Sequence, residues 1–261
     1  MISSQSDKGG PIDVGLFAAP YRCAGLAGWL VLGALTLSAC TARAPVGQTS
    51  VAGPEVAVED LYRETVFAAE TALFDRWRQV DIRGSGDWGL APGPQGELGI
   101  LGVPQESASA VYLDTDIDPF ACPVLEWEWT VGAVQPGADL TDKETDDVAA
   151  ALFVLFGDPG TPLSPNPVPT LRYVWTTDRH SKGDVIPNPY LPELVRNIVI
   201  QTGAGGAGSW RVERRNIVAD FEAAFGEAPD DFVWAIALFV DNDQTGEPAS
   251  AHFRRAAVYC D

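Results

Sequence analysis

A short polar stretch near the C-terminus, LFVDNDQTGE, joins an apolar segment to residue types that bind hard metal ions. Asp241, Asp243 and Thr245 occupy its first, third and fifth polar positions and a glycine the sixth, as in the first half of a calcium-binding loop. The twelfth position is His252 instead of glutamate, and the preceding segment is typical of a strand. The same residue types form Asx turns that need no ion. The sequence therefore predicts a structured polar turn, with a calcium site at these three residues as the alternative and no other cofactor required.

Two glutamates share one face of the segment VLEWEWTV, in which polar and apolar side chains alternate. By the repeat of a strand, Glu126 and Glu128 are about 7 Å apart, close to the separation of the paired carboxylates of glycosidases. They are the candidate catalytic acid and base; alternatively, they solvate an open sheet face. Nucleophilic and zinc chemistry have little support, because His180 and His252 are the only histidines and neither a nucleophile elbow nor a CxxC motif occurs.

Charged and amide residues also gather where apolar segments begin or end. These residues are Asp146, Asp147, Arg214, Arg215, Asn216, Asp220, Asp241 and Asp243. If the strand order brings the segment ends together, carboxylates around arginines form either a buried ion-pair network or a ligand site. Aromatic residues that would stack on a sugar ring there, or else belong to the core, are Tyr173, Trp175, Tyr190 and Trp210. The predicted ligand-binding residues are Asp147, Trp175, Arg215, Asn216 and Asp220.

The glycine-rich run GAGGAG, from Gly203 to Gly208, matches the pattern of a dinucleotide-binding loop. The residues after it, SWRVERRNI, alternate as in a strand, and the chain has no series of alternating helices and strands. We therefore interpret the run as a flexible hairpin turn without a phosphate ligand.

The elements that must position these residues are short. Runs rich in β-branched and aromatic residues and bounded by Gly, Pro, Asn or Asp are VYLDTDID, VLEWEWTV, AALFVLFG, LRYVWTTD, NIVIQTG, WRVERRNI, VWAIALFV and FRRAAVYC. Their spacing predicts an all-β fold, a jelly-roll-like β-sandwich of about eight strands. AALFVLFG and VWAIALFV are apolar on both faces, so we expect central strands covered on each side. One or two short helices are predicted: one begins at Asn216 or Asp220 and ends at Gly226, and the apolar spacing from Glu59 to Leu73 is consistent with a second.

Composition limits the classes of partner. The chain has 261 residues, 17 of them basic and 36 acidic, for a formal net charge of −19. Such a field repels phosphate backbones, so no nucleic-acid partner is expected. With 46% hydrophobic residues, the chain is long enough for one large domain with a full core and additional terminal segments.

The N-terminal residues indicate export. The apolar run AGLAGWLVLGALTLSA follows Arg22 and is shorter than the about 20 residues of a spanning helix, which favours the apolar part of a secretory signal. The tetrapeptide LSAC, ending at Cys40, resembles the lipobox of bacterial lipoproteins, in which the cysteine is diacylated; an ordinary signal peptide is the alternative. Thr41 stands where aspartate often retains lipoproteins at the inner membrane, so the resemblance implies a lipid anchor in the outer membrane of a bacterial cell envelope.

These signals divide the chain into three parts. The expected parts are a lipoprotein signal peptide (1–39), a flexible tether (40–58) and one β-sandwich domain (59–261). Once Cys23 is removed with the signal and Cys40 is acylated, Cys122 and Cys260 remain as a pair in an oxidising compartment. The sequence predicts a disulfide between them, with two buried free thiols as the alternative.

Several motifs also follow one another in the order and spacing of a bacterial family. They are DVAAALFVLFG, LRYVWT, NPY, IVIQTG, WRVERRNI with a later DF and FG, and IALFVDNDQTGE, preceded by SASAVYLD and LEWEW. In these motifs the chain resembles the domain of unknown function family 3047 (DUF3047) from Leu73 to Asp261. The family is expected to have an arginine where this chain has Glu128, so no role of a basic residue is carried over to that position.

The resemblance implies a jelly-roll-like sandwich similar to carbohydrate-binding or galactose-binding-like domains, and an exported protein. The positions that match the family's motifs are Asp147, Trp175, Arg215, Asn216, Asp220, Asp241, Asp243 and Thr245.

The function predicted from these observations is noncatalytic binding of a glycan or another envelope component by a lipid-anchored protein. One alternative is a hydrolase or lyase that acts on polysaccharide with Glu126, Glu128, Asp241 or Asp243 as acid and base. Another is a structural or scaffolding lipoprotein that contacts a protein partner. Exposed aromatic residues on a sheet face would favour glycan binding. Paired carboxylates in a cleft would favour the enzyme, and a flat apolar patch would favour the scaffolding role.

Overall fold

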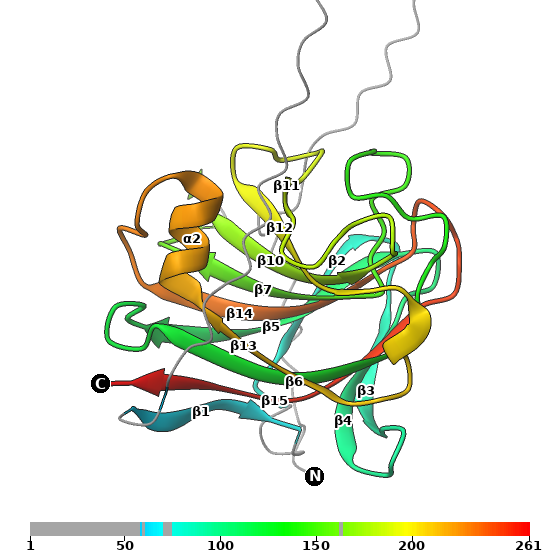
Figure 1. Cartoon of the computed structure of the whole chain (residues 1–261), viewed down its shortest axis with the longest axis horizontal. Coiled ribbons are helices and arrows are strands. Elements are labelled where there is room, and N and C mark those ends of the chain that lie inside the picture. Colours follow the sequence, from blue (N-terminus) through cyan, green and yellow to red (C-terminus); the bar gives the residue numbers. More distant parts are fainter. Residues whose placement is uncertain (1–57, 59–60, 70–74, 162–163) are drawn as a thin grey trace, which may run out of the picture.

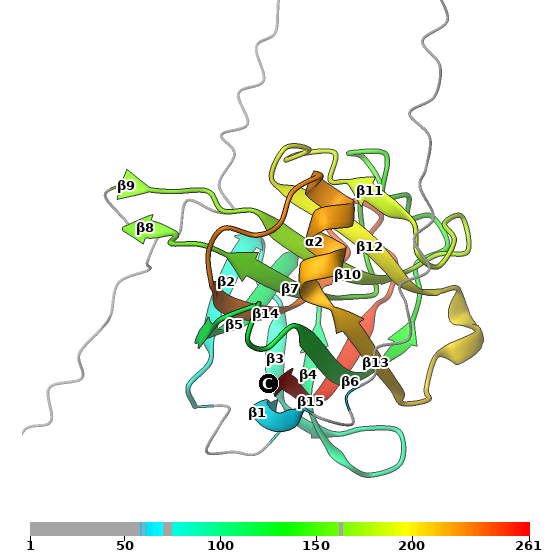
Figure 2. The same ribbon diagram turned by 60° about the vertical axis from the view of Figure 1, so that its left-hand side comes forward.

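The computed structural model describes residue 58 and residues 61–69, 75–161 and 164–261. In these ranges the chain forms two β-sheets that pack face to face, with one short α-helix beside them (Figures 1 and 2). The architecture is the all-β sandwich predicted from the sequence. The predicted signal peptide, nearly all of the predicted tether, and Cys40 lie outside the described residues. In the described part of the chain, no helix is long and apolar enough to span a membrane.

The six-stranded sheet is organised around the C-terminal strand. Its order is β13-β6-β15-β4-β3, and β1 also pairs with β15. Every pairing in this sheet is antiparallel. The strands are β1 (Tyr62–Ala68), β3 (Asp87–Pro92), β4 (Leu98–Val103), β6 (Val124–Ala133), β13 (Arg211–Asn216) and β15 (Ser250–Cys260).

The seven-stranded sheet has the order β11-β12-β10-β7-β14-β5-β2. Its pairings are antiparallel except for the parallel pair β10 and β12. The strands are β2 (Arg78–Arg83), β5 (Ala108–Ile117), β7 (Ala150–Phe156), β10 (Thr170–Thr176), β11 (Val185–Pro187), β12 (Val195–Thr202) and β14 (Val233–Asp241). A separate two-stranded ladder joins β8 (Gly160–Thr161) to β9 (Ser164–Pro165).

Large aromatic side chains fill the space between the two sheets. The alternation of β6 turns Trp127 and Trp129 inward, and both are fully buried. Trp127 stacks on Tyr173 of β10 at a ring-centroid distance of 5.0 Å, and Trp129 lies 5.9 Å from Trp175 of the same strand. Burial of these rings stabilises the sandwich, since each removes about 150–250 Å² from water.

A second apolar cluster lies on the outer face of the seven-stranded sheet. It contains Phe153 of β7, Val174 of β10 and Phe239 of β14, together with Leu140 and Val148 from the segment that precedes β7. These strands are therefore buried on both faces, as the sequence predicts for AALFVLFG and VWAIALFV. The segment before β7 acts as a cover over this part of the outer face.

The helix near the C-terminus has the limits that its sequence predicts. Helix α2 (Ile217–Phe225) begins after Asn216, whose side-chain oxygen accepts a hydrogen bond from the backbone N–H of Ala219. It ends at Gly226, which adopts the left-handed conformation with φ of 86°.

Two predictions about local structure are wrong. In place of a helix from Glu59 to Leu73, the described part of this segment forms β1, which pairs with the C-terminal half of β15. This pairing satisfies backbone groups at the exposed side of β15 and buries Phe67 completely, which outweighs a weak helical pattern.

The glycine run is no hairpin turn either: it contains a short 3-10 turn, Ala204–Gly206, between β12 and β13, which belong to different sheets.

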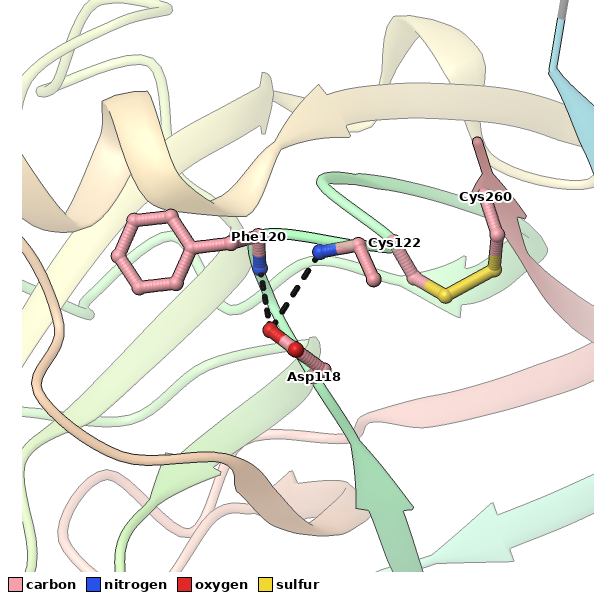
Figure 3. The surroundings of a disulfide bond; sticks show 5 residues. Asp118, Phe120, Cys122 and Cys260 are labelled. Atoms are coloured by element: carbon pink, nitrogen blue, oxygen red, sulfur yellow. Dashed lines mark hydrogen bonds between the residues drawn. A yellow bond between two sulfur atoms is a disulfide. The ribbon is translucent and has the colours of Figure 1, made fainter.

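A disulfide bond joins Cys122, just before β6, to Cys260 at the end of β15 (Figure 3). The two cysteines are 138 residues apart in the sequence. The carboxylate of Asp118 accepts a hydrogen bond from the backbone N–H of Phe120 at 2.9 Å and so forms the turn that leads to Cys122. The Phe120 ring points away from the disulfide and is exposed to solvent.

Candidate functional site

Four aspartates and an arginine form what we call the acid–arginine cluster: Asp146, Asp147, Arg172, Asp241 and Asp243. Arg172 projects from β10 onto the outer face of the seven-stranded sheet, while Asp241 ends β14, which is separated from β10 by β7. The Arg172 guanidinium lies 3.4 Å from an Asp146 oxygen and 3.7 Å from an Asp241 oxygen. All three side chains are buried, so the ion pairs lie in a region of low dielectric constant.

The loop after β14 is fixed by the carboxylate of Asp147. This carboxylate accepts hydrogen bonds from the backbone N–H of Gln244 at 3.2 Å, from the backbone N–H of Thr245 at 2.7 Å and from the Thr245 hydroxyl at 2.5 Å. Asp243 forms an ion pair with Arg83 of β2 at 2.9 Å. The structure therefore contains the polar turn predicted from the sequence, and it adds Asp147 to that turn.

Two carboxyl groups of the cluster, those of Asp146 and Asp241, have raised pKa values. Burial raises the pKa of Asp241 well above its ordinary value, as do its hydrogen bond with Asp243 and the charge of Asp147, whereas Arg172 opposes the rise. Burial likewise raises the pKa of Asp146 to about 6, against the attraction of Arg172. The cluster thus has more carboxylate charge than its arginines neutralise.

The remaining predicted ligand residues form a separate group. Asp220, in the first turn of α2, accepts hydrogen bonds at 2.8 Å from the hydroxyl of Tyr173 and from Nε of Arg215. Asn216 caps the helix, and Trp175 is a core residue whose indole N–H donates to the carbonyl of Gly203 at 3.1 Å. Burial, with the Asp220 charge, raises the pKa of Tyr173 well above its usual range. Each of these polar groups thus has a hydrogen-bond partner within the fold, so its presence is accounted for without a ligand.

The structure therefore brings Asp147, Asp241, Asp243 and Thr245 together but does not join them to Arg215, Asn216 and Asp220. Among the described residues, no hydrogen bond or ion pair links the two groups. Of the other aromatic candidates, Tyr190 lies under the Lys143 ammonium at 5.5 Å, and the Trp210 indole donates to Glu97 at 3.2 Å.

Glu126 and Glu128 share one face of β6, as predicted, but this face is not open to water. The two residues are 8% and 6% exposed because arginine side chains cover them. Glu126 pairs with Arg214 at 2.6 Å, and Glu128 pairs with Arg255 at 2.9 Å and Arg254 at 3.2 Å. Both carboxylates are therefore engaged by arginines of their own sheet and do not face an open cleft as a catalytic acid and base would.

A further group on the outer face of the seven-stranded sheet was not singled out from the sequence. Tyr112 of β5 and Trp234 of β14 meet edge to face at 5.8 Å, and Trp234 is half-buried. The Arg78 guanidinium of β2 lies 5.6 Å from the centre of the Tyr112 ring and pairs with Asp114 at 2.5 Å. We call these four residues the Tyr112–Trp234 platform. The alternation of VYLDTDID places Tyr112 and Asp114 on one face, but the strand neighbours that complete the group are not evident in the sequence.

The fold and these clusters define an all-β sandwich whose candidate sites lie on the outer face of the seven-stranded sheet and at its edge. The sequence model of one family matches residues 76–256, which is well over half of the chain. The protein thus belongs to the family described as Protein of unknown function (DUF3047), in agreement with the resemblance in its motifs.

Solved structures of similar architecture include several carbohydrate-binding modules. The family 11 module of the cellulosomal cellulase Lic26A-Cel5E of Clostridium thermocellum is 8% identical with a TM-score of 0.43, covering 77% of this chain and 96% of that one. The mannan-recognising module TmCBM27 is 10% identical with a TM-score of 0.34, covering 77% and 97%. The K3 adhesin domain of Lys-gingipain from Porphyromonas gingivalis is 10% identical with a TM-score of 0.34, covering 76% and 96%. At these values the likeness concerns the architecture alone. No curated protein matches the chain in sequence.

Proposed function

We propose that this chain is a lipid-anchored protein of the bacterial cell envelope that binds a glycan without catalysis. The binding surface in this proposal is the Tyr112–Trp234 platform. The observation that carries it is the position of the half-buried Trp234 indole, supported from below by the buried Tyr112 ring, beside an exposed Arg78–Asp114 pair on the same sheet face.

The platform has the two kinds of group that recognise a sugar. A partly exposed indole offers a flat apolar surface to the C–H face of a pyranose ring, and aromatic residues supply such area with little loss of conformational entropy. Arg78 and Asp114 are both exposed, with side-chain accessibilities of 54% and 47%, so they are able to exchange their mutual hydrogen bond for bonds to sugar hydroxyls. A donor and an acceptor side by side suit adjacent hydroxyl groups, which both donate and accept.

The proposal predicts a specific loss of binding when the indole is removed. The chain from Thr41 to Asp261 is screened on a glycan array, and the oligosaccharide that binds best is titrated by calorimetry. Trp234→Ala is expected to weaken its binding about tenfold, the effect of losing one stacking ring. Trp210→Ala, which removes another half-buried tryptophan from the loop just before β13, is expected to leave the affinity unchanged. Equal affinities of the two variants would reject the platform, and cleaved sugar products would reject the noncatalytic role.

The anchor rests on Cys40 and the lipobox-like residues before it. Two acyl chains hold a protein stably on a membrane, whereas one chain gives only marginal binding. We expect Cys40→Ala to move the protein from the membrane fraction of bacterial cells to the soluble periplasmic fraction. Retention of this variant in the membrane fraction would contradict a lipid anchor at Cys40.

A further inference from the structure

We infer that the acid–arginine cluster binds a divalent cation, best matched by Ca²⁺, through the carboxylates of Asp147, Asp241 and Asp243. This inference concerns a different place from the glycan platform and does not depend on it. One carboxylate oxygen of each of the three residues lies within 4.8 Å of the others. Oxygens bound to one Ca²⁺ at about 2.3–2.6 Å lie up to about 5 Å apart, so the three atoms fit around a single ion.

The charges of the cluster favour a divalent ion. Arg172 is the buried cation, and the side chain of Arg83, which pairs with Asp243, is 66% exposed. Together with Asp146, the three proposed ligands place four carboxylates against these two guanidinium groups. The excess is two negative charges in a largely buried site, and a buried charge needs a counter-charge or a proton.

Gln135 provides an independent indication that a ligand belongs here. Its side chain is 1% exposed, and its amide nitrogen donates to the backbone carbonyl of Asp241 at 2.5 Å. The amide oxygen, Oε1, has no hydrogen-bond partner among the described residues, so a buried acceptor lies beside the cluster with an unused lone pair. Asp146, which is 3% exposed, likewise has an unpartnered carboxylate oxygen, Oδ1. Such atoms are uncommon in proteins, and oxygen ligands of this kind are those that Ca²⁺ selects.

The loop after β14 leaves acceptor capacity for the ion. A carboxylate has about four acceptor sites, and Asp147 uses three for the N–H groups and the hydroxyl of the loop. Thr245, a ligand candidate from the sequence, donates its hydroxyl to Asp147 and thus positions this ligand. The ion would bridge the segment before β7 and the loop after β14, which are distant in the sequence. A proton shared by Asp241 and Asp243 is the competing way to satisfy the pair.

Calcium binding is tested with the purified full-length chain after treatment with EDTA. Addition of 1 mM CaCl₂ is expected to raise the melting temperature by about 5–10 °C if Kd is about 10 μM, and excess EDTA should reverse the shift. Calorimetry should give one ion per chain, and MgCl₂ at the same concentration should give a smaller shift because Mg²⁺ requires a regular octahedral shell.

Asp243→Asn is the informative variant because the amide retains the size of the Asp243 side chain, which is 4% exposed, and removes its charge. We expect it to abolish the calcium-dependent shift. Asp142→Asn is the matched control, since Asp142 is an exposed carboxylate in the segment before β7 and lies outside the cluster; its shift should equal that of the wild type. Absence of both a shift and heat of binding at 1 mM calcium would overturn the inference in favour of a shared proton. An undiminished shift in Asp243→Asn would overturn the assignment of the ligands.

Discussion

Cys260→Ser is expected to lower the free energy of unfolding by about 5 kcal/mol. The disulfide closes a loop between residues 138 positions apart, and the loss of chain entropy in the unfolded state grows with the logarithm of this length. The bond ties the end of β15 to the start of β6, two strands that also pair along most of their length. Reduction should therefore act mainly on the unfolded state and leave the paired strands in place. Urea denaturation of oxidised wild-type protein and of the variant measures the difference.

A double-mutant cycle separates the bond from the thiols. Because a single bond accounts for the decrease in the free energy of unfolding, Cys122→Ser is expected to lower it by about as much as Cys260→Ser. The variant with both serines is expected to lower it by no more than either single substitution does. Wild-type protein treated with dithiothreitol should behave in the same way. If the two single losses add in the double variant, the cysteines contribute separately and the disulfide is not the source of stability.

The sequence predicts those parts of the fold that short-range patterns determine. The alternation in VLEWEWTV correctly assigns Trp127 and Trp129 to the core face of β6, and doubly apolar runs identify the central strands β7 and β14. The caps Asn216 and Gly226 define α2 because each acts through hydrogen bonds to its own neighbourhood. By contrast, β1 is a strand because its backbone pairs with β15, the last strand of the chain, and no local pattern in the sequence indicates this pairing.

The candidate sites depend on strand order, and this information is absent from local patterns. Glu126 and Glu128 lie on the face that the alternation assigns, yet they are buried because β13 and β15 bring arginines over them. Asp147 and Asp241 meet because β7 and β14 are neighbours in the seven-stranded sheet. Arg215 instead lies near the end of β13 in the other sheet and pairs with Asp220 of the helix that follows this strand, so the predicted ligand residues divide into two groups. No periodicity in the sequence distinguishes these outcomes.

Arg172→Met is expected to lower the free energy of unfolding by about 3–5 kcal/mol at pH 8 in the presence of EDTA. The guanidinium is almost fully buried, and it is the group that neutralises Asp146 and Asp241. Methionine keeps apolar contact with Phe153 and Phe239, over whose rings Arg172 lies at 5.5 and 4.9 Å. The decrease in the free energy of unfolding therefore measures the cost of leaving the buried carboxylates of Asp146 and Asp241 without a counter-charge. This cost is the largest consequence of breaking a buried ion pair. Arg254→Met, which removes a partly exposed partner of Glu128, is the control and should change stability by less than about 1 kcal/mol.

The penalty for removing Arg172 should shrink as the pH falls. The pKa of Asp146 is raised from 3.8 to about 6, so its protonation favours the folded state: this stabilisation is complete below pH 3.8 and lost as the pH rises through about 6. Without the attraction of Arg172, the pKa of Asp146 in the folded state rises further. In the variant, Asp146 therefore remains protonated, and its protonation continues to stabilise the fold, up to a higher pH. Urea denaturation at pH 5, 6.5 and 8 should show the gap between wild type and Arg172→Met widening with pH, and Asp146→Asn in the same background should narrow it at pH 8. A penalty that is constant across these three pH values would show that packing of the long side chain, rather than neutralisation of the two aspartates, is what Arg172 contributes.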